Sequence, residues 1–144
     1  MDDKLIYGEN NLLVEEYKLL REEAGWKGMP EEQIKQSLNA CDYIVTVRDA
    51  DQIVGMARCL SDGVYMAYIF DVVVHRDYRG KNIGRSIIEK IICHYKDSNN
   101  YLMQIVLLAV TSDVEPFYKK LGFKRYPNLL NGAGMGMWIN GKPY

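Results

Sequence analysis

The sequence has few cysteines, and those that it has do not form close pairs. Cys41, Cys59 and Cys93 are its 3 cysteines, an odd number, and they lie far apart along the chain. Zinc knuckles and dithiol redox motifs need two cysteines separated by about two residues, so the sequence excludes both classes. Neither His75 nor His94 has a second histidine or cysteine three or four residues away, so we expect no metal site. We expect buried, reduced thiols in a cytoplasmic protein.

Long apolar runs and an excess of one charge are also missing. No apolar stretch approaches the ~20 residues that span a bilayer, and the first ten residues are polar and acidic, unlike a secretory leader. The 18 basic and 19 acidic residues give a net charge of -1, which lacks the positive field that favours nonspecific binding to nucleic acid. We therefore expect no membrane partner, no nucleic-acid partner and a small-molecule substrate.

Internal repeats, low-complexity segments and linkers are absent as well, so residues 1–144 are interpreted as a single domain. Helical spacing of apolar residues predicts helices over residues 10–24, 30–40, 83–95 and 113–121. Runs rich in β-branched and aromatic residues predict strands over residues 4–8, 43–47, 53–60, 64–74, 102–110, 123–126 and 134–139. The strand, helix, strand order over residues 64–110 predicts a parallel crossover in a mixed sheet with helices on both faces.

A basic turn that contains glycine joins the 64–74 strand to the next helix. Unpaired backbone N–H groups and the positive end of the helix dipole converge at such a helix start, so the turn predicts a site for a pyrophosphate. Gly80 and Gly84 permit close approach, and Asn82 tolerates left-handed backbone angles. Positive charge comes from Arg79, Lys81 and Arg85.

Two other phosphate motifs do not fit this turn. A nucleotide P-loop ends in Gly-Lys-Ser/Thr, whereas Gly84-Arg85-Ser86 lacks the lysine. A dinucleotide fingerprint needs three glycines at fixed spacing and an acidic residue about 20 residues later, and neither condition is met. An ordinary turn with solvated charges stays open from these residues alone.

Two segments resemble motifs of the GNAT superfamily of acyl-CoA N-acyltransferases. Arg79-Gly80-Lys81-Asn82-Ile83-Gly84 is similar to the Arg/Gln-x-x-Gly-x-Gly/Ala pattern after a valine-rich strand, with Asn82 where the family usually has glycine. Pro116-Phe117-Tyr118-Lys119-Lys120-Leu121-Gly122-Phe123 resembles the Phe-Tyr-x-x-x-Gly-Phe segment, although Thr111 or Ser112 replaces an asparagine that precedes it in the family. The resemblance extends over essentially the whole chain, to a branch of small bacterial GNAT proteins similar to plastid arylalkylamine acetyltransferases.

The resemblance implies an α/β fold with three layers, α/β/α, around a mixed central sheet. It implies transfer of an acetyl group from acetyl-CoA to the primary amine of a small molecule, by direct attack in a ternary complex and without a metal. Tyr118 would protonate the departing thiolate, and the resemblance leaves a homodimer open. The implied cofactor-binding residues are Val72, Val73, Val74, Arg79, Gly80, Lys81, Asn82, Ile83, Gly84, Arg85 and Thr111.

The general base is not evident. The family places Glu, His or an ordered water near the middle of the 64–74 strand, and Tyr68 and Phe70, which are not ordinary bases at neutral pH, occupy these positions. Strand alternation directs Asp71 away from the face of Phe70, so we expect a structural carboxylate bonded to a neighbouring loop. A water relay or an acceptor that is already deprotonated is the preferred interpretation.

Trp26 and Tyr68 are candidates for the acceptor pocket, with simple core packing as the alternative for such large aromatic residues. Two rival functions also remain: a protein lysine Nε-acetyltransferase, and a CoA-binding regulatory module without turnover. Retention of Tyr118 favours an enzyme.

Overall fold

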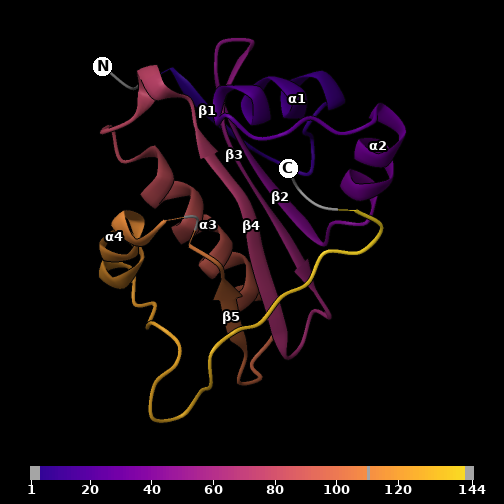
Figure 1. Cartoon of the computed structure of the whole chain (residues 1–144). Coiled ribbons are helices and arrows are strands. Elements are labelled where there is room, and N and C mark those ends of the chain that lie inside the picture. The colour runs from indigo at the N-terminus through magenta and orange to yellow at the C-terminus, as the bar shows by residue number, and fades with distance from the viewer. Residues whose placement is uncertain (1–3, 110, 142–144) are drawn as a thin grey trace. The chain divides into compact units, whose positions relative to one another are not determined.

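Five strands form one mixed sheet in the order β1-β2-β3-β4-β5, and all neighbours are antiparallel except β4 and β5. The computed structural model describes residues 4–109 and 111–141, and its contacts divide the chain into two units, Met1–Leu108 and Ala109–Tyr144, which are described separately. The whole sheet belongs to the first unit (Figure 1). Its strands are β1 (Leu5–Glu9), β2 (Tyr43–Asp49), β3 (Gln52–Ser61), β4 (Met66–Val74) and β5 (Gln104–Leu107).

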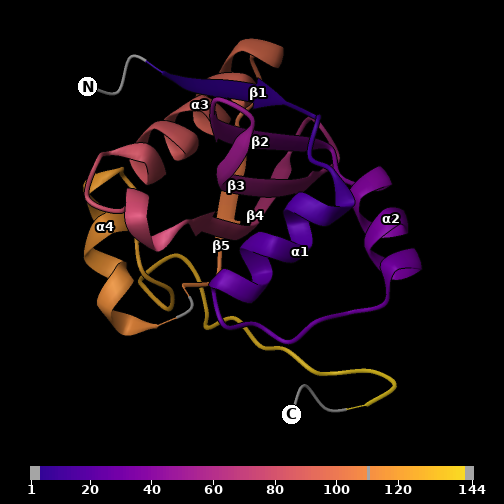
Figure 2. The same cartoon turned by 90° about the horizontal axis from the view of Figure 1, so that it is seen from above.

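Helices cover both faces of this sheet (Figure 2). Helices α1 (Val14–Glu23) and α2 (Glu31–Asn39) lie on one side, where α1 contacts β3 and β4. Helix α3 (Ile83–Ser98) lies on the other side against β2, β3 and β4, and it connects the parallel strands β4 and β5. The predicted three-layer α/β/α architecture with a mixed sheet and one parallel crossover is therefore confirmed.

Two apolar layers hold the helices on the sheet. On the side of α1, Tyr17 and Leu20 are buried in a cluster with Ile34, Met56 and Val73. The residues of α3 that recur at helical spacing are buried as predicted. A Cβ atom at Gly55 of β3 would lie 3.2 Å from Ile87 Cδ1, so the absence of a side chain there allows α3 to approach β3 closely. The buried residues of α3 are Ile83, Ile87, Ile88, Ile91 and Tyr95.

Element boundaries differ from the sequence prediction at a few positions. Helix α1 begins at Val14, because the Glu16 carboxylate accepts a hydrogen bond from the Leu13 N–H at 2.9 Å and satisfies the helix start there. Pro30 precedes α2 as its cap, with φ -56° and ψ 143°, and is not its first helical residue. Strand β5 is shorter than the predicted 102–110, and Val110 lies outside the described residues.

The second unit contains a single turn of 3-10 helix, η2 (Ser112–Val114), and helix α4 (Glu115–Lys120). Asp113 lies within η2, before α4, and accepts a hydrogen bond from the Thr111 hydroxyl, so α4 begins later than the predicted residue 113. Gly122, with φ +98°, follows the helix. The predicted strands over 123–126 and 134–139 are also wrong, because β-propensity makes a strand only where a partner is paired, and residues 123–126 and 134–139 form no ladder.

Candidate active site

The basic turn predicted from the sequence connects β4 to α3, and it is called the 79–86 turn below. Gly80 has φ +76° and Asn82 has φ 63°, so both residues adopt the left-handed conformation, which glycine and asparagine tolerate. Successive backbone N–H groups converge on one side of a chain that is bent in this way, which makes a concave site for an anion. Arg79, Lys81 and Arg85 are exposed around it.

The start of α3 leaves N–H groups free for a ligand. The Ser86 N–H donates to the Asn82 carbonyl at 3.0 Å, which is the first hydrogen bond of the helix. The N–H groups of Ile83, Gly84 and Arg85 precede this bond, so they have no acceptor within the helix. The first turn of α3 carries no acidic residue, and the positive end of its dipole therefore meets no carboxylate there.

The three basic side chains of the turn differ in their surroundings. Arg79 donates from Nε to the Val74 carbonyl at 3.0 Å and so joins the turn to the end of β4. Arg85 pairs with Glu89 at 2.8 Å on the exposed side of α3. Lys81 Nζ lies 5.2 Å from the ring of Tyr78. The chain therefore presents a cationic rim around main-chain donors.

The second half of β4 pairs with a neighbouring strand on only one of its two sides. β5 pairs with the first half, from Met66 to Ile69, whereas Val73 and Val74 pair only with β3. Among the described residues, no strand pairs with the β5 side of residues 70–74. An extended ligand could bind this edge by main-chain hydrogen bonds in the manner of an added strand.

A β-bulge interrupts β4 at this point. Met56 pairs with Val73 and Arg58 with Phe70, so Asp71 and Val72 together lie opposite the single residue Ala57. Asp71 has φ 51°, a left-handed conformation that costs a residue other than glycine about 1–3 kcal/mol. The strain therefore lies two residues after Ile69, the last residue of β4 that pairs with β5.

Four side chains converge beneath the bulge, and they are called the Asp71 cluster: Tyr17, Arg21, Arg58 and Asp71. Arg58 is 2% exposed, and its Nη1 lies 2.8 Å from Asp71 Oδ2. The Tyr17 hydroxyl donates to the same oxygen at 2.5 Å, and Arg21 Nη1 lies 3.9 Å from Oδ1. Burial and the bond to Asp71 raise the pKa of Tyr17, so the hydroxyl stays a proton donor. Two cations therefore surround one carboxylate.

The bulge overturns two predictions about Asp71. Asp71 and its neighbour Phe70 both contact Arg58, whose Cζ lies 4.7 Å from the Phe70 ring, so strand alternation fails at this pair. The physical reason is the extra residue of the bulge, which turns two consecutive side chains to one face. The partners of Asp71 lie on α1 and β3, not on a neighbouring loop as predicted.

The two acceptor candidates lie near different members of this cluster. The ring of Tyr68 stacks on Phe70 at 5.4 Å, and Phe70 in turn lies beneath Arg58. Trp26 lies between α1 and α2, with its ring 5.5 Å from Arg21 Cζ. Both candidates are half-buried, so each one keeps part of its ring accessible. The cluster therefore links the two residues through direct contacts.

Sequence reasoning did not single out Arg58 or Tyr17 as site residues. The signal for Arg58 was present, because a single arginine within the apolar run of β3 requires a buried partner. The identity of that partner could not be read from the sequence.

Tyr118 and Thr111 belong to the second unit, and their predicted roles stay predictions. The ring of Tyr118 makes edge contacts with Phe117 at 4.9 Å and Phe123 at 5.9 Å. Burial raises the pKa of Tyr118, so its hydroxyl retains its proton at neutral pH, as a proton donor must. The Thr111 hydroxyl donates a hydrogen bond to the Asp113 carboxylate.

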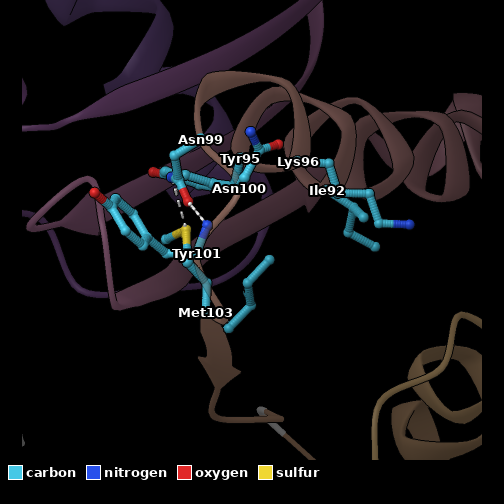
Figure 3. Close-up of a pocket in the computed structure, with 8 residues that line it drawn as sticks. Ile92, Tyr95, Lys96, Asn99, Asn100, Tyr101 and Met103 are labelled. Atoms are coloured by element: carbon cyan, nitrogen blue, oxygen red, sulfur yellow. Dashed lines mark hydrogen bonds between the residues drawn. The ribbon is translucent and has the colours of Figure 1, made fainter.

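A pocket of about 250 Å³ lies at the opposite end of α3 from the turn (Figure 3). Its lining includes Ile92, Tyr95 and Lys96 of α3 and Met103 near the start of β5. Because α3 has 16 residues, it is roughly 24 Å long, and this pocket is remote from the 79–86 turn. The residues that the structure describes contain no group of three potential metal ligands, and no helix among them is long and apolar enough to cross a bilayer.

Comparison with known proteins gives one consistent result. The family model described as acetyltransferase (GNAT) domain matches residues 39–125. An N-acetyltransferase of Pyropia yezoensis, ycf52, is 33% identical over 135 residues, which are 90% of this chain and 76% of that protein. The crystal structure of a probable acetyltransferase from methicillin-resistant Staphylococcus aureus has a TM-score of 0.81 and 26% identity, and the match covers 95% of this chain and 99% of that one.

Two further relatives are named by their acceptors. Histone acetyltransferase TAP1 of Glycine max is 30% identical, over 83% of this chain and 55% of that protein. Serotonin N-acetyltransferase 2, chloroplastic, of Oryza sativa is 27% identical, over 75% of this chain and 54% of that protein. Relatives of similar likeness thus carry names with a protein acceptor and with a small amine.

Proposed function

This chain belongs to the GNAT family of acetyltransferases, and from that premise we propose that it transfers the acetyl group of acetyl-CoA to the primary amine of a small molecule. The observation that carries the proposal is the 79–86 turn, which places free main-chain donors beside a half-open strand. The resemblance of the turn to the family motif and its left-handed backbone at Gly80 and Asn82 support the same interpretation.

The residues of the turn fit the phosphates of acetyl-CoA. The N–H groups of Ile83, Gly84 and Arg85 have no acceptor within α3 and lie at the positive end of the helix dipole. Arg79 and Lys81 add positive charge at the rim. The open edge of β4 suits the extended arm between the phosphates and the thioester, with Val72, Val73 and Val74 as the predicted contacts. Thr111 stays a further candidate.

In the proposed reaction, the main task of the protein is to position the amine against the thioester. The amine nitrogen forms a bond to the thioester carbonyl carbon, the bond from carbon to sulfur breaks, and the amine loses a proton. Main-chain donors stabilise charge on the carbonyl oxygen, and Tyr118 gives its proton to the departing thiolate. We assign the proton of the amine to a water relay, because both oxygens of Asp71 already face donors of the protein, Arg58 and Tyr17 at Oδ2 and Arg21 at Oδ1.

The aromatic side chains beside the Asp71 cluster support a small-molecule acceptor. Trp26 and Tyr68 are half-buried and not fully enclosed, which favours contact with a small organic amine. The name of the rice relative, a serotonin N-acetyltransferase, supports this choice. The name of the soybean relative, a histone acetyltransferase, favours a protein lysine as the second candidate.

An acceptor screen that detects free CoA thiol tests the proposal. The panel contains arylalkylamines, polyamines, amino sugars and lysine peptides, with acetyl-CoA in excess and a reaction without enzyme as the control. We expect thiol release with at least one small amine and acetylated product by mass spectrometry. Thiol release only with lysine peptides would mean that the acceptor is a protein lysine and not a small molecule. Tight CoA binding without any thiol release would indicate a regulatory module.

A further inference from the structure

We infer that Asp71 is a positioning residue that fixes the bulge of β4 and, through it, the strand edge along which the acyl donor lies. The inference rests on the proposed function, because the edge matters only if acetyl-CoA binds there. It assigns a role to a buried carboxylate that the transfer chemistry itself does not use.

The backbone of Asp71 is the first observation. Asp71 and Val72 lie opposite one residue of β3, and Asp71 has φ 51°. Residues other than glycine rarely adopt this conformation, and they keep it only where the surrounding contacts hold it in place. A bulge in the same strand without such contacts could slip into regular pairing, which would move every following side chain to the other face.

The contacts that hold Asp71 are the second observation. Its Oδ2 accepts from Arg58 Nη1 at 2.8 Å and from the Tyr17 hydroxyl at 2.5 Å. Arg58 is itself fixed, since its Nη1 also donates to Tyr17 at 2.9 Å, its Nη2 donates to Ser37, and its Nε lies 3.2 Å from Cys41 Sγ. Both partners are almost fully buried, Tyr17 at 1% exposure and Arg58 at 2%. The carboxylate is therefore clamped to helix α1 and strand β3.

Arg21 connects the same carboxylate to the segment between α1 and α2. Its Nη1 lies 3.9 Å from Asp71 Oδ1, and its Nη2 donates to the Lys27 carbonyl at 2.6 Å. The ring of Trp26 lies 5.5 Å from Arg21 Cζ. Asp71 thus joins the strand proposed to hold the donor to the segment proposed to hold the acceptor, so a change there should disturb the alignment of both.

A role as general base does not explain this arrangement. Asp71 Oδ2 already accepts from Arg58 Nη1 and from the Tyr17 hydroxyl, and Oδ1 faces Arg21 Nη1 at 3.9 Å, so both carboxylate oxygens face donors of the protein and not an open site. A group that acts through the geometry of its strand should change affinity for the arm of CoA as well as turnover.

The variants Asp71→Asn and Asp71→Gly test the role of the carboxylate separately from the role of the left-handed backbone. Asparagine and glycine both tolerate the left-handed conformation, but neither supplies the anion for Arg58. Tyr17→Phe removes a single hydroxyl from the clamp. Tyr43→Phe is the matched control, because Tyr43 is also buried and donates to a carboxylate, Glu9, at 2.7 Å, but lies outside the Asp71 cluster.

Three measurements on the full chain decide the question, all below the melting temperature of each variant. For Asp71→Asn and Asp71→Gly we expect kcat to fall about a hundredfold, the loss that follows a misplacement of about 1 Å. Affinity for CoA should fall, whereas affinity for adenosine 3′,5′-bisphosphate, which lacks the arm, should not change. Amide hydrogen exchange over residues 66–74 should become faster. Tyr17→Phe should show a smaller effect in the same direction, and Tyr43→Phe should keep wild-type kcat.

The outcomes separate this inference from the proposed function. If the wild-type chain neither binds CoA nor transfers acetyl, the proposed function is wrong. Amide hydrogen exchange over residues 66–74 in the Asp71 variants would still decide whether Asp71 fixes the bulge. Wild-type kcat, CoA affinity and exchange in Asp71→Asn would overturn the inference. A lower melting temperature with unchanged kcat and CoA affinity would also overturn it, since Asp71 would then be only structural. If the Asp71 variants do not fold, the comparison of Tyr17→Phe with Tyr43→Phe decides by the same criteria.

Discussion

The 79–86 turn and the Asp71 cluster are built in opposite ways, although both adjoin the second half of β4. The turn is exposed and consists of main-chain donors from consecutive residues. The cluster is largely buried and consists of three charged side chains and one tyrosine from α1, β3 and β4. Local sequence therefore suffices to specify the turn, whereas the cluster requires the whole unit to fold. Substitutions in the turn should affect ligand binding, and substitutions in the cluster should affect stability and alignment.

The largest expected effect is the loss of CoA binding in Gly84→Glu. The new carboxylate and side chain would occupy the place where the donors of the turn meet the pyrophosphate. The fold should survive, because a glutamate near a helix N-terminus is compatible with the helix. Titration calorimetry with CoA checks the loss, and Gly132→Glu, at an exposed glycine with nothing within 4 Å, is the control. Unchanged affinity in a folded Gly84→Glu variant would place the phosphates elsewhere.

Next in size is the destabilisation caused by Arg58→Ala. Removal of one partner of a buried ion pair leaves the other charge unpaired, which typically costs about 3–5 kcal/mol. Unfolding in urea, followed by circular dichroism, should show this loss in the free energy of unfolding. Arg58→Ala with Asp71→Ala should be less destabilised than the sum of the two single changes, because the double variant lacks both charges of the Arg58–Asp71 pair. A loss under 1 kcal/mol would mean that water reaches Asp71.

Tyr118→Phe extends the comparison to the second unit, where the proposed role is chemical. Removal of the hydroxyl alone should lower turnover about ten- to a thousandfold, with little change in stability or acetyl-CoA affinity. Burial raises the pKa of Tyr118, so the wild-type advantage should persist through neutral pH and shrink only where the tyrosine ionises, above roughly 10. Single-turnover kinetics with a saturating acceptor measures the chemical step, and Tyr101→Phe, on an exposed ring, is the control. Wild-type single-turnover rates would remove Tyr118 from the mechanism.

Acetyl-CoA itself should stabilise the folded chain. A ligand at a hundred times its dissociation constant adds about 2.7 kcal/mol, so the melting temperature should rise with acetyl-CoA and with CoA. NADH should cause no shift, because the turn lacks the dinucleotide fingerprint. Differential scanning fluorimetry measures both. A shift with NADH and none with CoA would contradict the cofactor assignment.

The smallest effect is expected for the ion pair of the turn. Arg85→Ala removes a pair with Glu89 in which the side chains are 61% and 49% exposed. Exposed pairs contribute about 0–1 kcal/mol, so the free energy of unfolding should change far less than in Arg58→Ala. The same urea titration compares the two arginine variants directly. Equal losses in the free energy of unfolding would contradict the distinction between an exposed turn and a buried cluster.

Sequence patterns predicted most elements of the first unit because their periodicities are strong. The isoleucines of α3 recur on one helical face, and the strand, helix, strand order requires a parallel crossover. Prediction failed over residues 123–126 and 134–139, where apolar and β-branched residues favoured strands that the structure does not contain. A strand exists only through pairing, and local composition does not specify a partner.

The sequence alone determined the 79–86 turn, because Gly80, Asn82 and the start of α3 act within a few consecutive residues. It also determined the family, through the same motif and the segment that contains Tyr118. Only the tertiary structure decided that Asp71 pairs with Arg58, Tyr17 and Arg21. The physical reason is that a bulge reverses strand alternation, and its place depends on the register between β3 and β4, which no local pattern encodes.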